Sequence, residues 1–236
     1  MSFLELRDVN AYYGKSHVLF DLSLRVDCGE LVALLGRNGA GKSTTLRSIM
    51  GVVTVKSGMI TFRGDDITND PSHTISDRGI AYIPEGRRIF TGLTVEENLR
   101  TGYAGHDIDA SFAERAGAMY EYFPRLEERT KQRAGTMSGG EQQMLAIARA
   151  LISEPDLVLI DEPTEGLMPS LITKLKEVLP RINESGISML LIEQNAKLAM
   201  DISDRTYVIG EGRLETEGPS DELRTDEAIQ ERYLTV

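Results

Sequence analysis

The sequence contains a single cysteine, Cys28, among its 236 residues. No internal disulfide can form, so the composition fits a reducing compartment. Cys28 stands in a turn without metal-ligand spacing around it, and His17, His73 and His106 are too scattered to form a metal site. We therefore expect neither a disulfide scaffold nor a metal centre built from cysteine and histidine.

Basic residues are also few. There are 26 Lys and Arg against 37 Asp and Glu, which gives a formal net charge of −11. A general nucleic-acid binder needs a positive field that attracts phosphate, so we expect no nucleic-acid partner. Apolar residues make up 41% of the chain and charged residues 27%, which is typical of globular proteins and argues against gross disorder. The length allows one or two domains with a substantial core.

Long apolar segments are absent from the sequence as well. Runs such as Leu31–Leu35 are far shorter than the segment that a membrane-spanning helix needs. The first six residues contain neither a basic region nor a long apolar region, so we expect no signal peptide. Any role at a membrane would then be performed from outside the bilayer. No fixed-period repeat or low-complexity stretch is evident.

The pattern of apolar residues predicts an α/β protein. Alternating or continuous apolar runs predict strands at 20–26, 31–35, 59–62, 80–83, 157–160 and 187–192, and a hairpin at 207–216. Helices are predicted over 43–50, much of 86–152, 170–181 and part of the tail, 218–236. Pro124 is expected to end the helix whose apolar face runs from Phe112 to Phe123. Strands that alternate with helices favour a parallel sheet with crossover helices.

A glycine-rich motif follows the predicted strand at 31–35 and precedes a predicted helix. It has the pattern G-x-x-x-x-G-K-S and consists of Gly36, Arg37, Asn38, Gly39, Ala40, Gly41, Lys42 and Ser43. Glycines let backbone amides curl around phosphate oxygens, and the helix N-terminus adds partial positive charge. Lys42 would contact the β- and γ-phosphates, and the Ser43 hydroxyl could ligate Mg²⁺. The alternative is a plain glycine-rich turn, which the strand–loop–helix context disfavours.

An apolar strand ends in two carboxylates, Asp161 and Glu162. Ligands bind at the carboxyl edge of open α/β sheets, where these residues would lie. Asp161 would hold Mg²⁺ or its water, and Glu162 would orient or deprotonate an attacking water. A strand that runs into a solvated acidic turn is the alternative, and the glycine-rich motif makes the functional interpretation the better one.

A third motif opens a predicted helix with Ser138, Gly139, Gly140 and Glu141. Ser138 with Glu141 three residues later forms a capping box, as do Thr94 and Glu97. The box does not explain the two glycines, which weaken a helix. They suggest that another group approaches this helix closely, and a glycine-rich helix N-terminus could bind a second anion.

These three motifs, in this order, resemble those of an ABC-type ATPase subunit, and the resemblance covers essentially the whole chain. It implies one ABC ATPase domain over 1–236. A RecA-like P-loop core with an N-terminal antiparallel β-subdomain would comprise 1–85 and 153–236, and an inserted helical subdomain would comprise 86–152. The resemblance also implies a head-to-tail dimer. In it, Ser138, Gly139, Gly140 and Glu141 of one subunit would close over ATP held by the backbone amides of 36–44, Thr44 included, on the other.

Further site residues follow from the resemblance. Tyr13 matches the aromatic residue that stacks on adenine; the alternative is a core tyrosine at a strand end. Glu85 occupies the place of a Mg²⁺-sensing glutamine and can still ligate the ion. Gln194 replaces the family's switch histidine, so it can contact the γ-phosphate but cannot carry positive charge. Met168 replaces an aspartate in the dimer-contacting loop.

The segments 84–88 (Pro-Glu-Gly-Arg-Arg) and 193–195 (Glu-Gln-Asn) resemble one subgroup: the ATP-binding subunits of branched-chain amino-acid importers and of urea or amide importers. This implies transmembrane permease subunits, a second ATPase subunit and, indirectly, a periplasmic solute-binding protein as partners. The protein would lie at the cytoplasmic face of the inner (plasma) membrane. A permease helix would dock from Glu85 through the helix after Thr94, where Arg87 and Arg88 could contact it or form an internal salt bridge.

The sequence also bears on two other functions. A soluble ABC ATPase of DNA repair or translation would need a coiled-coil insertion, a second cassette or a basic surface, and the sequence has none of these. The missing switch histidine leaves open an ATP-dependent clamp that binds without hydrolysing. The transported solute and the choice between homodimer and heterodimer depend on other chains.

Overall fold

The computed structural model describes residues 2–104 and 110–227. The larger of its two sheets has the strand order β10-β9-β3-β8-β7-β6. These strands are β3 (Leu31–Leu35), β6 (Ile80–Ile83), β7 (Leu157–Asp161), β8 (Ser188–Glu193), β9 (Arg205–Gly210) and β10 (Arg213–Pro219). Neighbours from β9 to β6 pair in parallel, and β10 is antiparallel to β9. The predicted parallel sheet and the predicted terminal hairpin are therefore confirmed.

A second sheet, which is antiparallel, is built mostly from the N-terminal part of the chain. Its order is β2-β1-β4-β5, with β1 at Ser2–Tyr13, β2 at Ser16–Asp27, β4 at Thr54–Phe62 and β5 at Asp65–Asp66. The antiparallel β-subdomain expected from the resemblance is thus present. Strand β4 is longer than the sequence pattern predicts, because its first half is exposed except for Val55 and carries no apolar alternation.

The helices in the described residues are α1 (Lys42–Ile49), α2 (Ser72–Asp77), α3 (Val95–Tyr103), α4 (Phe112–Tyr122), α5 (Pro124–Glu127), α6 (Gly139–Leu151), α7 (Pro169–Glu184), α8 (Ala196–Ile202) and α9 (Ser220–Thr225). Pro124 separates α4 from α5 as expected and also begins α5, because proline is tolerated at the first helical position. The expected capping boxes at Thr94 and Ser138 are formed, and a third, at Ser111, accompanies them.

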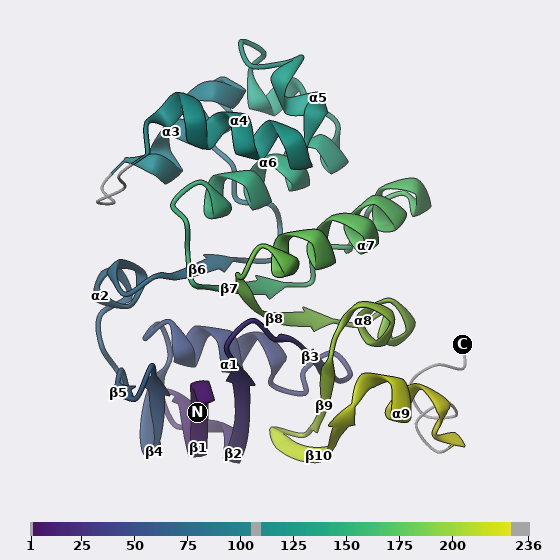
Figure 1. Ribbon diagram of the computed structural model, residues 1–236. Coiled ribbons are helices and arrows are strands. Elements are labelled where there is room, and N and C mark those ends of the chain that lie inside the picture. The colour runs from purple at the N-terminus through teal and green to yellow at the C-terminus, as the bar shows by residue number, and fades with distance from the viewer. Residues whose placement is uncertain (1, 105–109, 228–236) are drawn as a thin grey trace.

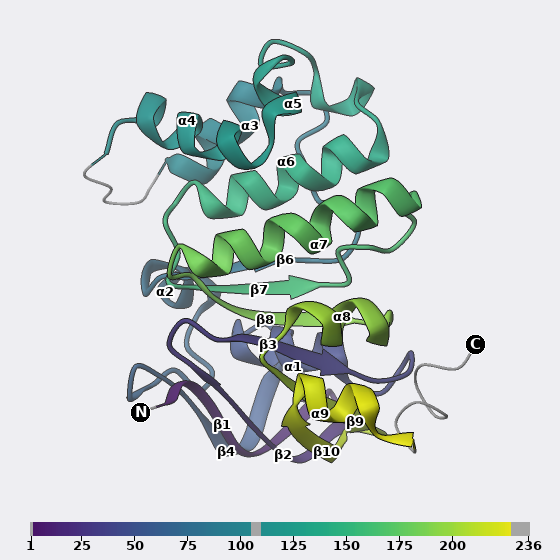
Figure 2. The same cartoon turned by 45° about the vertical axis from the view of Figure 1, so that its right-hand side comes forward.

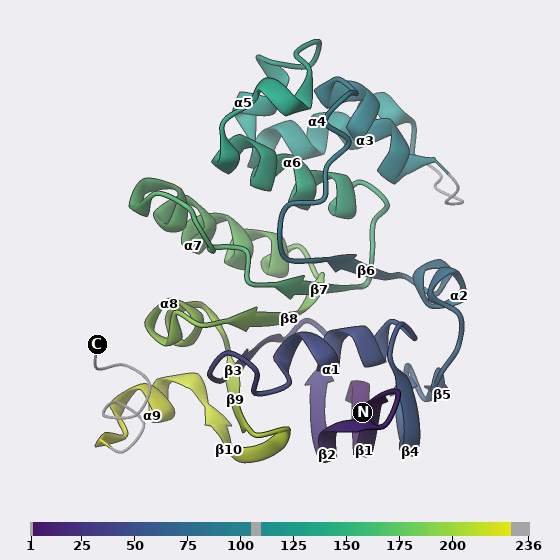
Figure 3. The ribbon, with the colours of Figure 1, turned by 180° about the vertical axis from the view of Figure 1, so that it is seen from behind.

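The two faces of the large sheet are covered by different layers. Helix α1 lies between the two sheets (Figures 1 and 3), and Leu46 and Ile49 of α1 belong to the core that joins them. The helices α3, α4, α6 and α7 cover the opposite face, with α7 lying along β7 (Figure 2). Residues of β7 alternate between these two cores, with Leu159 in one and Val158 in the other. This explains the continuous apolar run, since a strand covered on both faces needs no polar side.

The register of the central strands brings three chain segments to one edge. Leu35 at the end of β3 pairs with Glu193 of β8, and Ile192 pairs with Asp161 at the end of β7. Because parallel strands share their carboxyl edge, the segments that follow β3, β7 and β8 begin side by side.

Within residues 2–104 and 110–227, no helix has both the length and the apolar character required to cross a bilayer. Helix α9 falls in the tail where a helix was expected. His106 and residues 228–236 lie outside the described part of the chain.

Candidate functional site

The glycine-rich motif forms the connection between β3 and α1. Gly39 and Gly41 have φ angles of 81° and 109°, a region that favours glycine. Gly41 precedes α1 and offers no side chain to cap it, so the first amides of the helix are open to a ligand's phosphate oxygens. The loop conformation therefore fits the triphosphate that its sequence pattern predicts as ligand.

Lys42 is buried beneath this loop, with 4% of its surface exposed. Its Nζ donates hydrogen bonds to the carbonyl oxygens of Gly36, at 3.0 Å, and Arg37, at 3.3 Å. The same Nζ lies 3.2 Å from Oε1 of Glu162. The ammonium group thus holds the loop and the carboxylate of the predicted base together.

A hollow of about 380 Å³ opens beside the loop. The residues that line it come from the segments after β3, β6, β7 and β8 and from β2: Val18, Asn38, Gly39, Gly41, Lys42, Ser43, Thr44, Glu85, Glu162, Glu165 and Gln194. Five residues of the loop motif, together with Thr44, therefore meet Glu85, Glu162 and Gln194 in one place. Gly36, Arg37 and the buried Ala40 do not line this hollow.

Asp161 lies behind Ser43 and is 1% exposed. Ser43 Oγ donates to Oδ1 of Asp161 at 3.0 Å, and the Tyr82 hydroxyl donates to Oδ2 at 3.1 Å. Burial raises the pKa of Asp161, while the two hydrogen bonds favour its charged form. The two oxygen donors, Ser43 and Asp161, suit Mg²⁺, which prefers hard oxygen ligands and completes its shell with water and phosphate.

Sequence reasoning missed Tyr82, which lies on β6 beside the carboxylate of Asp161. Burial and the charge of Asp161 raise the pKa of Tyr82 to about 12, so the hydroxyl keeps its proton and remains a donor. Its only signal in the sequence is a side chain with a hydroxyl group within an otherwise apolar strand. That signal is too weak to find it without the pairing of β6 with β7.

Glu162 follows β7 with a φ of 47°, a conformation that a residue with a side chain adopts only where its surroundings hold it. Its amide donates to the carbonyl of Ile192 at 2.9 Å. The side-chain amide of Gln194 donates to Oε2 of Glu162, and Lys42 contacts Oε1. The predicted base and the predicted γ-phosphate contact are therefore direct neighbours.

Two further carboxylates, Glu85 and Glu165, line the same hollow. A hydrogen bond with Glu85 and the negative charge of Glu85 raise the pKa of Glu165. Glu85 thus lines the hollow beside the glycine-rich loop with Glu165 as its partner, and its role as a Mg²⁺ ligand stays a prediction.

Tyr13 ends β1 and is 44% exposed, which excludes a core tyrosine at this position. It lies outside the lining of the hollow, and its hydroxyl accepts a hydrogen bond from Nη1 of Arg47 on α1 at 3.4 Å. The ring is thus exposed beside the helix that begins at the phosphate loop, where an adenine could reach it.

Ser138, Gly139, Gly140 and Glu141 lie away from this hollow, at the start of α6. A Cβ atom on Gly140 would lie 1.9 Å from Leu171 of α7, and one on Gly139 would lie 2.5 Å from Nη1 of Arg87. Within this chain, the groups that approach the two glycines closely are therefore Leu171 and Arg87. The described residues include no carboxylate paired with Arg87, so the internal salt bridge considered for it is not formed.

A family model described as "ABC transporter" matches residues 19–165. The high-affinity branched-chain amino acid transport ATP-binding protein BraG of Pseudomonas aeruginosa is 46% identical, over 98% of this chain and 99% of that protein. The probable branched-chain amino acid transport ATP-binding protein LivF of Archaeoglobus fulgidus is 38% identical over 94% of each chain. The lipopolysaccharide export ATP-binding protein LptB of Escherichia coli is 34% identical over 99% and 98%.

The chain belongs to the ABC transporter family.

Among solved structures, the ADP conformation of MJ1267, an ATP-binding cassette of an ABC transporter, superposes with a TM-score of 0.87 at 26% identity over 100% of both chains. The predicted RecA-like P-loop fold and the predicted ABC-type ATPase are therefore confirmed. ATP is the nucleotide that such a cassette binds, and the open amides, the buried lysine and the adjacent hollow fit its phosphates.

The Tyr82 hydroxyl provides a prediction about the metal. The variant Tyr82→Phe leaves Oδ2 of Asp161 buried without its donor, so the affinity for a divalent ion in the presence of a non-hydrolysable ATP analogue should fall about tenfold. Mn²⁺ titration followed by electron paramagnetic resonance measures this directly. The matched control is Tyr207→Phe, which removes the hydroxyl of a buried tyrosine that accepts a hydrogen bond from the amide of Arg25, outside the hollow. Unchanged Mn²⁺ affinity in Tyr82→Phe would show that Tyr82 does not support the metal site.

Proposed function

We propose that this ATPase energises a membrane importer of branched-chain amino acids. The observation that carries the ATP-hydrolysing part of this proposal is the cluster formed by Lys42, Glu162 and Gln194 beside the Ser43–Asp161 pair. The near full-length similarity to BraG and LivF supports this solute class over urea or amides. The relatives are named as transport proteins, which argues against a role in DNA repair or translation.

Each residue of the site would have a separate role in ATP hydrolysis. Lys42 and the amides of the loop hold the β- and γ-phosphates, and Ser43, Asp161 and Glu85 would hold Mg²⁺. When bound, Mg²⁺ neutralises phosphate charge. Glu162 takes a proton from the attacking water, because its carboxylate already points into the hollow between Lys42 and Gln194. Gln194 donates to the γ-phosphate and cannot add the positive charge of a histidine.

The second subunit would complete the site. In a head-to-tail dimer, the start of α6 from the partner, at Ser138–Glu141, would close over the nucleotide and stabilise its γ-phosphate. Two features support this arrangement. The start of α6 lies away from the hollow of its own chain, and Met168 is 63% exposed in the loop expected to face the partner. ATP binding would then drive closure, and hydrolysis would reopen the dimer.

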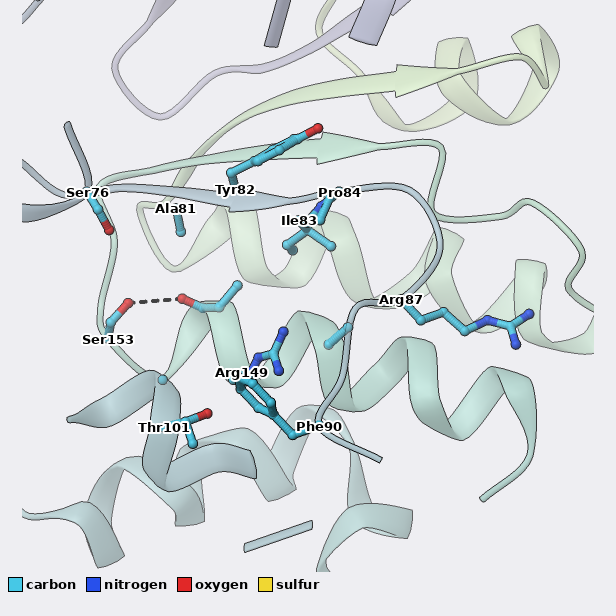
Figure 4. A pocket seen from close by; sticks show the side chains of 13 residues that line it. Ser76, Ala81, Tyr82, Ile83, Pro84, Arg87, Phe90, Thr101, Arg149 and Ser153 are labelled. Carbon is cyan, nitrogen blue, oxygen red and sulfur yellow. Dashed lines mark hydrogen bonds between the residues drawn. The ribbon is translucent and has the colours of Figure 1, made fainter. Parts of the chain in front are cut away.

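A second hollow supports docking to a permease. It has a volume of about 320 Å³ and lies between β6 and the helical segment 86–152, which we assign as the helical subdomain (Figure 4). Phe90 is 51% exposed there, and the guanidinium of Arg149 lies 4.9 Å from its ring centroid. An exposed aromatic ring in a cleft is a typical anchor for a partner helix.

The remaining partners follow from the importer assignment. A cytoplasmic helix of each transmembrane subunit would occupy this second hollow. The ATPase would lie at the cytoplasmic face of the inner membrane, and a periplasmic binding protein would deliver the solute to the permease. Solute choice would then belong to those subunits rather than to this chain.

The variant Glu162→Gln tests the chemical role. It removes the base but keeps the shape of the side chain, so ATP affinity should stay within about threefold while turnover falls by about 10²-fold or more. Phosphate release and nucleotide titration measure the two quantities, and gel filtration with ATP should reveal a trapped dimer. Glu184→Gln, the same change at an exposed position on α7, is the control. Turnover at the wild-type rate in Glu162→Gln would remove Glu162 from this role.

The variant Phe90→Ala tests the docking surface. It should weaken binding to the membrane subunits about tenfold or more, because it removes the aromatic anchor that the partner helix would bury, while the ATP affinity of the isolated subunit stays unchanged. Val52→Ala, which truncates a side chain that is 62% exposed on another face, provides the control. Equal binding of Phe90→Ala and wild type to detergent-solubilised permease would exclude this hollow as the docking site.

The solute class is tested in proteoliposomes that contain the cognate permease and binding protein. ATP-driven uptake of labelled leucine, isoleucine and valine is expected, and Glu162→Gln should abolish it. Uptake of urea or short amides without branched-chain amino acids would contradict the proposed solute and leave the ATPase assignment intact.

A further inference from the structure

One buried carboxylate beside the site has no part in the chemistry above. Glu193 ends β8 and is 2% exposed. Burial raises the pKa of its carboxyl, and the groups that act on it are Thr164, Asn195 and the carboxylate of Glu162. Among residues 2–104 and 110–227, no cation is paired with Glu193, and a buried acid in such surroundings destabilises the fold unless hydrogen bonds compensate for it.

The two oxygens of this carboxylate contact two different loops. Oε1 accepts a hydrogen bond from the amide of Thr164 at 3.1 Å, and Oε2 accepts from the amide of Asn195 at 3.4 Å. Thr164 comes two residues after Glu162, and Asn195 comes directly after Gln194. One side chain therefore bridges the loop that carries the base and the loop that carries the γ-phosphate contact.

The segment after β7 depends on this bridge. The amide of Glu162 is held by the carbonyl of Ile192, Pro163 has no amide hydrogen, and the amide of Thr164 is held by Glu193. Both available amides of 162–164 are thus fixed by the last two residues of β8. Without the second anchor, the strained φ of Glu162 would be free to relax.

We propose that Glu193 is a positioning residue that clamps the Glu162 and Gln194 loops into one catalytic arrangement. The inference rests on the proposed role of Glu162. The loop that ends at the exposed Met168 begins at the clamped Thr164. The clamp therefore also fixes the base relative to the surface proposed to meet the second subunit.

The variant Glu193→Gln tests the clamp in the full chain. Its side-chain amide places an N–H donor against one of the two backbone N–H groups. The hydrogen bond to that loop is therefore lost. Hydrogen exchange of the amides of 164–168, measured without nucleotide, should become about tenfold faster. The kcat for ATP should fall about tenfold while the Kd for ATP stays within about twofold, because the phosphate loop is untouched.

The matched control is Glu30→Gln. The Glu30 carboxylate also accepts from a backbone amide, that of Asp27 at 2.8 Å, and pairs with Arg205 away from the site. Its exchange at 164–168 and its kcat should equal those of the wild type. A second variant, Glu193→Asp, keeps the charge but is too short to reach both amides. It should show the same faster exchange, and it decides the question if Glu193→Gln does not fold.

Unchanged exchange at 164–168 in the Glu193 variants would overturn the clamp, and faster exchange with unchanged kcat would overturn the positioning role. Failure of the proposed function is a different result, namely full turnover in Glu162→Gln. The exchange measurement uses no nucleotide, so the two failures can be told apart.

Discussion

The buried ammonium group of Lys42 is the interaction on which the site depends. At 4% exposure it needs compensation, and it obtains this from two loop carbonyls and the Glu162 carboxylate. These contacts shape the glycine-rich loop from below and tie it to the end of β7. The other charged side chains that line the hollow, Glu85, Glu162 and Glu165, are acidic. A triphosphate entering such a site would meet repulsion from these carboxylates, which explains why it should arrive with a divalent cation.

The sheet topology makes this interaction possible. In the order β3-β8-β7, the strand that leads into the phosphate loop and the strand that ends in Asp161 flank the strand that ends in Glu193. Gln194 and Glu162 therefore emerge next to each other, although 32 residues separate them in sequence. The apolar interiors of these strands are covered on both faces, so the carboxyl edge is where polar side chains can gather. The strands fix where the loops begin, and the loop residues determine which chemical groups are present at the site.

Local patterns in the sequence predicted the parts of the structure that depend on local physics. The glycine-rich loop, the capping boxes at Thr94 and Ser138, the buried strands and the hairpin all have such patterns, and each is present. Tyr82 and Glu193 could not be predicted from the sequence, because their roles depend on neighbours about 80 and 30 residues away. The glycines of α6 predict that another group approaches closely, but no sequence pattern identifies Leu171 as the group that fills the space. Tertiary contacts between side chains of distant elements have no periodicity to reveal them.

The most direct test of the account is the affinity for ATP with and without Mg²⁺, measured by calorimetry for the wild type and for Lys42→Ala. The exposed Lys15, changed to Ala, provides the control, and thermal unfolding confirms that each variant is folded. The account predicts Mg²⁺-dependent binding in the wild type and in Lys15→Ala, and a loss of about 100-fold in Lys42→Ala, which removes the phosphate contact and leaves Glu162 without its cation. Equal affinity for MgATP in a folded Lys42→Ala variant would contradict it.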